Sequence, residues 1–295
     1  MEPTHEPVLL TPVVDLLDPS RGGLFVDCTV GLGGHARAVL DGGAARLLGL
    51  DRDPNALDLA ARALAPWHDR VELVHADYRE LPAILAARGI DAIDGALADL
   101  GVSSMQFDAP GRGFSFRRDE PLDMRMDQTQ GPTAAELVAD ADESDLADVI
   151  YRYGEERFSR RIARRIVEAR GRSPIVTTTQ LADIVRHAIP RKGYQRIDPA
   201  TRTFQALRIW VNRELEGLDV FLTATASLLR RGARFAVITF HSLEDRVVKH
   251  TFRALAAGEA AVRLLTRKPV VPDEHELARN PRARSAKLRA IERLA

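Results

Sequence analysis

The chain has 295 residues, of which 45% are hydrophobic and 28% charged, and its formal net charge is zero. This length and composition predict a stable globular protein of one large domain or two ordinary ones, with a substantial core. Acids and prolines in the first twenty residues argue against a signal peptide, and no uncharged run approaches the roughly 18 residues of a membrane-spanning helix. A single cysteine, Cys28, rules out intrachain disulfides and a four-cysteine zinc site, so we expect a cytoplasmic protein without a metal centre.

Strands and helices alternate in the first hundred residues. Apolar runs typical of buried strands lie at 24–30, 46–50, 71–76 and 92–98, with helical stretches between them. The helix predicted over 54–65 has a proline in its first turn and apolar residues along one face. This alternation indicates a parallel sheet with crossover helices.

The turn after the first strand, Gly31-Leu32-Gly33-Gly34-His35, indicates a site for a nucleotide-type cofactor. Glycines there let the backbone approach a ligand, and an acid about 20 residues further on can bind ribose hydroxyls, which is where Asp51 lies. The third glycine of the dinucleotide motif is missing. S-adenosylmethionine, which is cationic and has no phosphate, suits a turn flanked by Asp27 and Asp51, whereas an ordinary tight turn is the alternative.

After Asp99 the pattern becomes helical for about a hundred residues, following a segment at 105–130 that is rich in Gly, Pro, Arg and Asp. The segment 158–171 has apolar residues at helical spacing, with arginines at 160, 161, 164 and 165 on its flanks. A further helix ends before Pro190, and 204–229 is predicted to be helical with a break at Gly217.

A strand is predicted again over 233–240, ending at His241. Ser242, with Asp245 three residues later, indicates a capping box that begins a helix. Residues 262–267 and 286–291 could form a closing antiparallel pair. The expected fold is therefore α/β, a doubly wound seven-stranded sheet of residues 1–105 and 208–295, interrupted after its fourth strand by a helical insert at 106–207.

Charge is unevenly distributed along the chain. Residues 1–100 hold 8 arginines against 16 acids, so the remaining residues carry a balance of +8. Eight arginines lie in 152–172 against three acids, and seven basic residues lie in 186–213 against Asp198 alone. These segments favour a polyanionic partner over simple solvated helix faces.

Ligands of open parallel sheets bind beyond the carboxyl ends of the strands, where His35, Asp51, Tyr78, Asp99 and His241 are expected. Tyr78 could stack on adenine or be an ordinary half-buried tyrosine. Asp99 is costly to place at the tip of a buried strand unless something binds it. A carboxylate there could accept a hydrogen bond from an amine that is to be methylated. His35 and His241 are candidates for proton transfer or for structural hydrogen bonds.

Ten segments of the chain resemble the ribosomal small-subunit RNA methyltransferase H family, also called MraW. They are HEPVLL at His5, VGLGGH at Val30, LDRDP at Leu50, DLGVSS at Asp99, RGFSF at Arg112, LDMRMD at Leu122, YGEERF at Tyr153, ATRTFQALRIWVN at Ala200, FHSLEDR at Phe240 and NPRARS at Asn280. The resemblance spans nearly the whole chain. It implies a class I S-adenosylmethionine-dependent methyltransferase that methylates N4 of a cytidine in the decoding region of 16S rRNA, with the helical insert as an RNA-recognition domain.

The resemblance also implies which residues bind the cofactor, namely Gly33, Gly34, His35, Asp51, Tyr78, Asp99 and Gln106. It leaves the catalytic group open, with Asp99 as the best candidate. The chain departs from the family pattern at Tyr78, where phenylalanine is common, and at Asp198, where a basic residue or histidine is expected. The proline-rich tetrapeptide of amino-methyltransferases is also absent, since Leu100 and Gly101 follow Asp99.

Several functional hypotheses remain open on the sequence alone. The same cofactor could serve another RNA, a protein or a small-molecule substrate, or the chain could be a ribosome-assembly factor that binds cofactor without turnover. A nicotinamide-dependent dehydrogenase is disfavoured by the missing third glycine. The partner expected is 16S rRNA within the small ribosomal subunit, and the sequence does not choose between a monomer and a homodimer.

Overall fold

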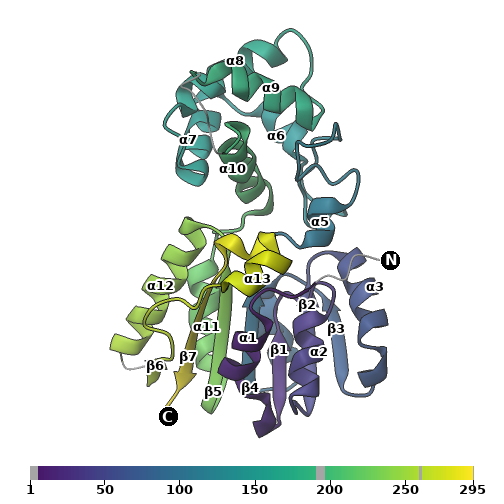
Figure 1. Cartoon of the computed structure of the whole chain (residues 1–295), viewed down its shortest axis with the longest axis vertical. Coiled ribbons are helices and arrows are strands. Elements are labelled where there is room, and N and C mark those ends of the chain that lie inside the picture. The colour runs from purple at the N-terminus through teal and green to yellow at the C-terminus, as the bar shows by residue number, and fades with distance from the viewer. Residues whose placement is uncertain (1–5, 191–196, 259–260, 295) are drawn as a thin grey trace. The chain divides into compact units, whose positions relative to one another are not determined.

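The computed structural model describes residues 6–190, 197–258 and 261–294, which form two compact units (Figure 1). We call Met1–Gly101 with Leu215–Ala295 the sheet unit, and Val102–Glu214 the helical unit. The helical unit thus runs from residue 102 to 214, where the sequence suggested 106 to 207. His5, the first residue of the HEPVLL motif, lies outside the described residues, as do Arg191, Lys192 and Arg196 of the second basic segment.

The sheet unit is built on a seven-stranded sheet in the order β3-β2-β1-β4-β5-β7-β6. Its strands are β1 (Leu24–Asp27), β2 (Arg46–Asp51), β3 (Val71–His75), β4 (Ile93–Asp99), β5 (Leu229–Thr239), β6 (Val262–Leu264) and β7 (Lys287–Arg293). The first five pair in parallel, and β7 runs antiparallel between β5 and β6. This arrangement confirms the predicted seven-stranded sheet and its antiparallel closing pair.

Helices cover both faces of the sheet because the strand side chains alternate. They are α1 (Leu10–Leu17), α2 (Gly34–Asp41), α3 (Pro54–Ala63), α4 (Leu81–Ala87), α11 (Leu218–Leu228), α12 (Ser242–Ala257) and α13 (Glu274–Arg279). Phe25 and Leu47 point into a core shared with α1, α2 and α3, whereas Val26 and Leu48 point into one shared with α4, α11 and α12. Both faces are therefore dry, and ligands must approach from a strand end.

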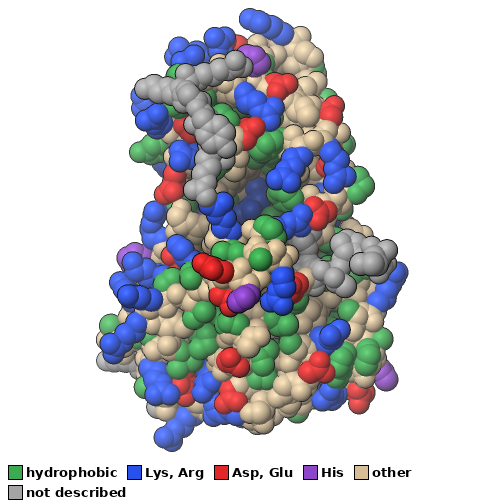
Figure 2. Space-filling model, in the orientation of Figure 1, with side chains coloured by type: hydrophobic (Ala, Val, Ile, Leu, Met, Phe, Trp, Pro, Cys, Tyr) green, Lys and Arg blue, Asp and Glu red, His purple; other side chains and the backbone are tan. Residues whose placement is uncertain are grey.

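The helical unit has a core of its own. Its helices are α5 (Ser104–Asp108), α6 (Ala134–Asp140), α7 (Glu143–Gly154), α8 (Ser159–Arg170), α9 (Thr178–Ala188) and α10 (Ala200–Asn212). The amphipathic helix predicted at 158–171 is confirmed as α8, which buries Ile162, Ala163 and Ile166. The arginines at its flanks, 160, 161, 164 and 165, are exposed, and basic side chains are spread over the visible face of this unit in Figure 2.

Three sequence predictions need correction at element ends. Strand β1 ends at Asp27 instead of 30, although Val30 N–H still donates to the Leu50 carbonyl at 2.7 Å. Strand β5 begins at Leu229, inside the apolar run that the sequence assigned to a helix. The capping box of α12 is formed by His241 and Glu244, one residue earlier than Ser242 and Asp245.

The predicted helix break at Gly217 is confirmed, since this residue has φ 65° and precedes α11. Among the described residues, no helix is both long and apolar enough to cross a membrane.

Candidate functional site

The glycine turn joins β1 to α2. Gly31 and Gly33 have φ values of 52° and 80°, a region that glycine enters without a steric penalty, and Gly33 N–H donates to the Val30 carbonyl at 2.8 Å. At Gly34, a Cβ atom would lie 2.4 Å from Cγ of Pro7. The turn thus needs glycine for its own geometry, and that requirement by itself would also suit an ordinary tight turn.

Asp51, the last residue of β2, is bonded directly to this turn. Its Oδ2 accepts the N–H of Gly31 at 2.8 Å, and its Oδ1 accepts the N–H of Asp53 at 2.9 Å. Burial raises the pKa of Asp51, and the hydrogen bonds from Asp53 and Gly31 oppose that rise. Each carboxylate oxygen keeps a second lone pair, so both can still accept hydrogen bonds from a ligand.

Asp27, at the end of β1, adds a second buried acid. It accepts the N–H of Thr29 at 3.1 Å. Burial raises the pKa of Asp27 to about 7, the hydrogen bond from Thr29 opposes the rise, and the neighbouring Asp51 carboxylate adds to it. Carboxyls gathered in this way favour a cationic ligand, because a positive charge relieves their mutual repulsion.

Asp99 ends β4 and carries the clearest sign of a missing partner. Its main-chain N–H donates to Oγ1 of Thr29 at 2.7 Å. Its carboxylate Oδ1 is buried and accepts no hydrogen bond from the described part of the chain. Burial raises the pKa of Asp99 strongly, and the carboxylates of Asp27 and Glu244 add to the rise. A buried oxygen without a donor is costly, so this atom indicates a ligand with N–H groups.

His35 lies beside Asp99, in the first turn of α2. Its Nδ1 is 3.8 Å from Oδ2 of Asp99, and its Nε2 is 2.9 Å from the main-chain oxygen of Val8. The ring is almost fully enclosed, with 8% of the side chain exposed. The structure therefore brings the glycine turn, His35, Asp51 and Asp99 together, as the sequence suggested.

Tyr78 follows β3, next to β2 in the sheet. Its ring centroid lies 4.5 Å from that of Phe221, so the ring packs partly on the core. Beside it, Arg79 donates two hydrogen bonds of 2.7 Å to Asp77. Burial would raise the pKa of Asp77, but the bonds from Arg79 and the charge of Arg52 lower it overall. This acid is already neutralised, in contrast to Asp27 and Asp99.

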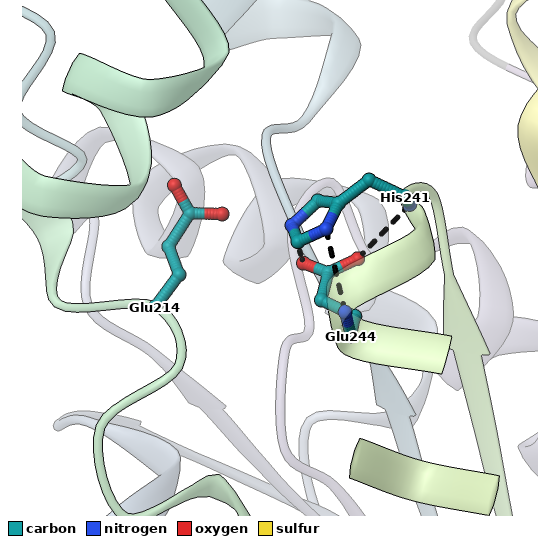
Figure 3. A group of neighbouring side chains, drawn as sticks. All are labelled: Glu214, His241 and Glu244. Carbon is teal, nitrogen blue, oxygen red and sulfur yellow. Dashed lines mark hydrogen bonds and ion pairs between the residues drawn. The ribbon is translucent and has the colours of Figure 1, made fainter. Parts of the chain in front are cut away.

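His241 and Glu244 form a buried pair at the start of α12 (Figure 3). Glu244 N–H donates to Nδ1 of His241 at 3.3 Å, and Nε2 of His241 lies 3.1 Å from the Glu244 carboxylate. Sequence reasoning singled out His241 but missed Glu244, whose signal was the acid three residues after the histidine. Glu214, drawn in the same figure, belongs to the helical unit and pairs there with Arg208 at 2.8 Å.

Gln106 belongs to the helical unit, whereas the glycine turn, His35, Asp51 and Asp99 belong to the sheet unit. It is the third residue of α5 and forms a capping box with Ser103, in which Gln106 N–H donates to the Ser103 hydroxyl at 3.2 Å. Its side-chain oxygen accepts the Ser103 N–H at 3.0 Å. The buried Gln106 side chain thus stabilises the start of α5.

A family comparison decides what kind of protein this is. The family model of the MraW methylase family matches residues 2–294. The chain belongs to this family. It is 51% identical to the ribosomal RNA small subunit methyltransferase H of Bradyrhizobium diazoefficiens, over 98% of this chain and 91% of that one.

Relatives of this chain carry the same name in Cyanothece (52% identical, 98% of this chain and 95% of the relative) and Geotalea uraniireducens (48% identical, 98% of both). A solved rRNA methylase from Streptococcus thermophilus aligns over 99% of this chain and 100% of its own at 12% identity, with a TM-score of 0.43.

Methylases of this class take their methyl group from S-adenosylmethionine, and the residues at the strand ends fit that molecule. A cationic ligand suits the buried carboxyls of Asp27 and Asp99, and an adenosyl group needs no phosphate-binding helix at the glycine turn. The individual contacts expected at Gly33, Gly34, His35, Asp51, Tyr78, Asp99 and Gln106 stay predictions.

Proposed function

We propose that this chain methylates the N4 amine of a cytidine in the decoding region of 16S rRNA, using S-adenosylmethionine. Family membership and the names of its relatives support ribosomal RNA of the small subunit as the substrate class. The single observation that supports an amine target is the buried Oδ1 of Asp99, which accepts no hydrogen bond within the described residues. An enzyme acting on ribosomal subunits would work in the cytoplasm.

The amine needs help from the protein because its lone pair is delocalised into the cytosine ring. Asp99 accepts one N–H of the amine at Oδ1, which holds the nitrogen in line with the methyl group and offsets the positive charge that develops there. Bound S-adenosylmethionine supplies the methyl group and leaves as the neutral thioether. The carboxylate of Asp51 binds the ribose hydroxyls and Tyr78 packs against adenine.

The helical unit supplies the RNA-binding surface in this proposal. Four exposed arginines of α8 lie on the flanks of its buried face, at 160, 161, 164 and 165. Arg164 and Arg165 face acids only at the surface, with Glu143 at 3.7 Å and Glu168 at 3.0 Å, and such pairs exchange readily for phosphate. The cytidine must be unstacked from its neighbours to reach the strand ends.

Methyl transfer to small ribosomal subunits that lack the modification tests the proposal. With tritiated S-adenosylmethionine, we expect label in N4-methylcytidine after nucleoside analysis, and none with subunits that already carry it. Asp99→Asn should lower kcat by about 10²- to 10³-fold, because the amide is a weaker acceptor for a developing cation. Asp58→Asn, at an exposed position of α3, is the matched control.

Two results would contradict the proposal. Label in another RNA or in a protein would point to a different substrate. The absence of N4-methylcytidine at saturating cofactor would favour an assembly factor that binds without turnover.

A further inference from the structure

The His35 ring has one nitrogen whose state is fixed by its partner. Nε2 lies 2.9 Å from the Val8 carbonyl oxygen, which can only accept, so Nε2 carries a hydrogen. In the neutral ring, Nδ1 is then an unprotonated acceptor. That nitrogen faces Oδ2 of Asp99 at 3.8 Å, and the ring is held in this orientation by the carbonyl behind it.

Two acceptors that face each other are stable only with a proton between them or on one of them. Among the described residues, the other ionisable groups that act on Asp99 are the acids Asp27 on β1 and Glu244 on α12, and Glu244 is paired with His241. These carboxylates make a positive charge on the imidazole favourable. The surroundings of His35 are thus arranged for a ring that gains a proton.

We propose that the His35 side chain is a positioning residue that takes over the amine proton from Asp99. This deepens the function proposed above and rests on it. A cofactor contact is predicted at His35, and this proposal assigns that contact to the main chain, which leaves the ring a separate task beside Asp99.

The bond between N4 and the methyl carbon forms as the carbon–sulfur bond breaks, with its electron pair staying on sulfur. The cationic cofactor displaces the proton that Asp99 and His35 share in the cofactor-free protein, so the pair enters this step as a carboxylate and a neutral imidazole. The methylated amine then gives one proton to the Asp99 carboxylate. That proton passes to Nδ1 of His35, which restores the carboxylate and leaves an imidazolium between Asp99 and the Val8 carbonyl, and solvent finally takes the proton. The 3.8 Å separation must shorten or hold a water for this transfer, as catalytic hydrogen bonds often tighten on substrate binding.

A purely structural histidine is the competing explanation. The ring ties Val8, just before α1, to the start of α2, and that link alone could justify its burial. His35→Gln separates the two roles, because the glutamine amide can still donate to the Val8 carbonyl but cannot accept a proton at the position of Nδ1. His68→Gln, at an exposed position, is the control.

Two measurements test the proposal. In steady-state methyl transfer, His35→Gln should lower kcat by at least about tenfold while the Kd of S-adenosylmethionine from calorimetry stays within about twofold of wild type. In the cofactor-free protein, nitrogen NMR of the imidazoles should find the Nδ1 resonance of His35 shifted by Asp99→Asn toward that of an unprotonated nitrogen, with His68 unaffected.

The outcomes are distinct. The role of the ring would be overturned by any of three results. The first is an unchanged kcat in His35→Gln, and the second is a loss of cofactor affinity large enough to account for the slower rate. The third is an Nδ1 chemical shift of His35 that does not change in Asp99→Asn. The NMR experiment needs no substrate, so its result is valid whichever nucleoside the enzyme methylates. A methylated nucleoside other than N4-methylcytidine would overturn only the proposed function.

Discussion

Buried acids at the strand ends make the cofactor-free protein less stable than its fold would allow. Asp27, Asp51 and Asp99 all have raised pKa values because burial disfavours their charged forms. A cationic ligand would recover that free energy on binding. The acids therefore lower the stability of the cofactor-free protein and raise its affinity for a cationic cofactor.

Replacing Asp27 should reveal this cost as a pH dependence. Its folded pKa is about 7 and its unfolded value 3.8, so the native state holds a proton that the unfolded state has lost, and stability falls as pH rises through this window. Asp27→Asn keeps an acceptor for Thr29 and should equal wild type near about pH 4, then exceed it by at most about 4 kcal/mol at about pH 8.

Urea unfolding, followed by Trp67 fluorescence in a Trp210→Phe background, measures this difference, because Trp67 packs on the core of the sheet unit. A difference between variant and wild type that does not change with pH would contradict the assignment.

Asp51 should control cofactor affinity. Asp51→Asn replaces one carboxylate oxygen by a donor, so the ribose hydroxyls and the N–H groups of Gly31 and Asp53 compete for a single acceptor. We expect the Kd of S-adenosylmethionine to rise about 10- to 100-fold in calorimetry. The exposed Asp58→Asn should bind like wild type, and equal affinities in both variants would argue against a ribose contact.

The residues that follow apolar strands were predictable from sequence. Asp51 and Asp99 end strands and His35 follows the glycines of the turn, and parallel strands bring such positions to one edge of the sheet. Glu244 was missed because its role depends on how α12 begins, and the lone Oδ1 of Asp99 is visible only once every neighbour is placed.

At the scale of elements, close packing between α7 and α10 stabilises the helical unit. Gly154 ends α7, and its missing side chain lets the carbonyl of Arg202 approach. A Cβ there would lie 2.6 Å from that oxygen, and backbone atoms cannot easily move away.

Gly154→Ala should therefore destabilise the helical unit by about 1–3 kcal/mol. Urea unfolding followed by Trp210 fluorescence in a Trp67→Phe background reports on this unit, because Trp210 packs against its core. Gly171→Ala, whose Cβ would have an ordinary 3.5 Å contact with the Val167 carbonyl, should leave the midpoint nearly unchanged. Equal effects of the two substitutions would disprove the steric explanation.

Element types were predicted better than element ends. Apolar runs and helical periodicity depend on which face is buried, and burial is what fixes a strand or an amphipathic helix. Ends depend on single hydrogen bonds. The apolar run at 228–229 contains no signal that the helix α11 stops and β5 begins, and the cap of α12 uses a histidine instead of the adjacent serine.

At the scale of the whole molecule, the positive charge of residues 101–295 is less concentrated in the helical unit than the sequence analysis suggests. Residues 102–214 hold 19 basic and 17 acidic residues, whereas residues 215–295 hold 15 basic and 9 acidic ones. The basic character of the helical unit is therefore local, centred on α8 and on the segment before α10. RNA binding by this unit should depend on a few arginines and not on its net charge.

Replacing Arg161, Arg164 and Arg165 together by glutamine tests this dependence. The affinity for a decoding-region RNA should fall, and the slope of log K against log salt should decrease by about 2, since each lost phosphate contact removes about 0.7–0.9. Filter binding across a potassium chloride series measures the slope. A triple variant of Arg62, Arg88 and Arg230, three exposed arginines of the sheet unit, loses the same charge and should keep the wild-type slope.

The pairing of β4 with β5 has a consequence for synthesis of the protein. These central strands hydrogen-bond along Gly95–Asp99 and Arg234–Ile238, yet the entire helical unit is translated between them. A nascent chain that has just left the ribosome as far as residue 214 can complete the helical core but lacks three strands of the sheet. At this stage the sheet is half-built and its β4 edge is uncovered. The chain is then most exposed to aggregation and most dependent on chaperones.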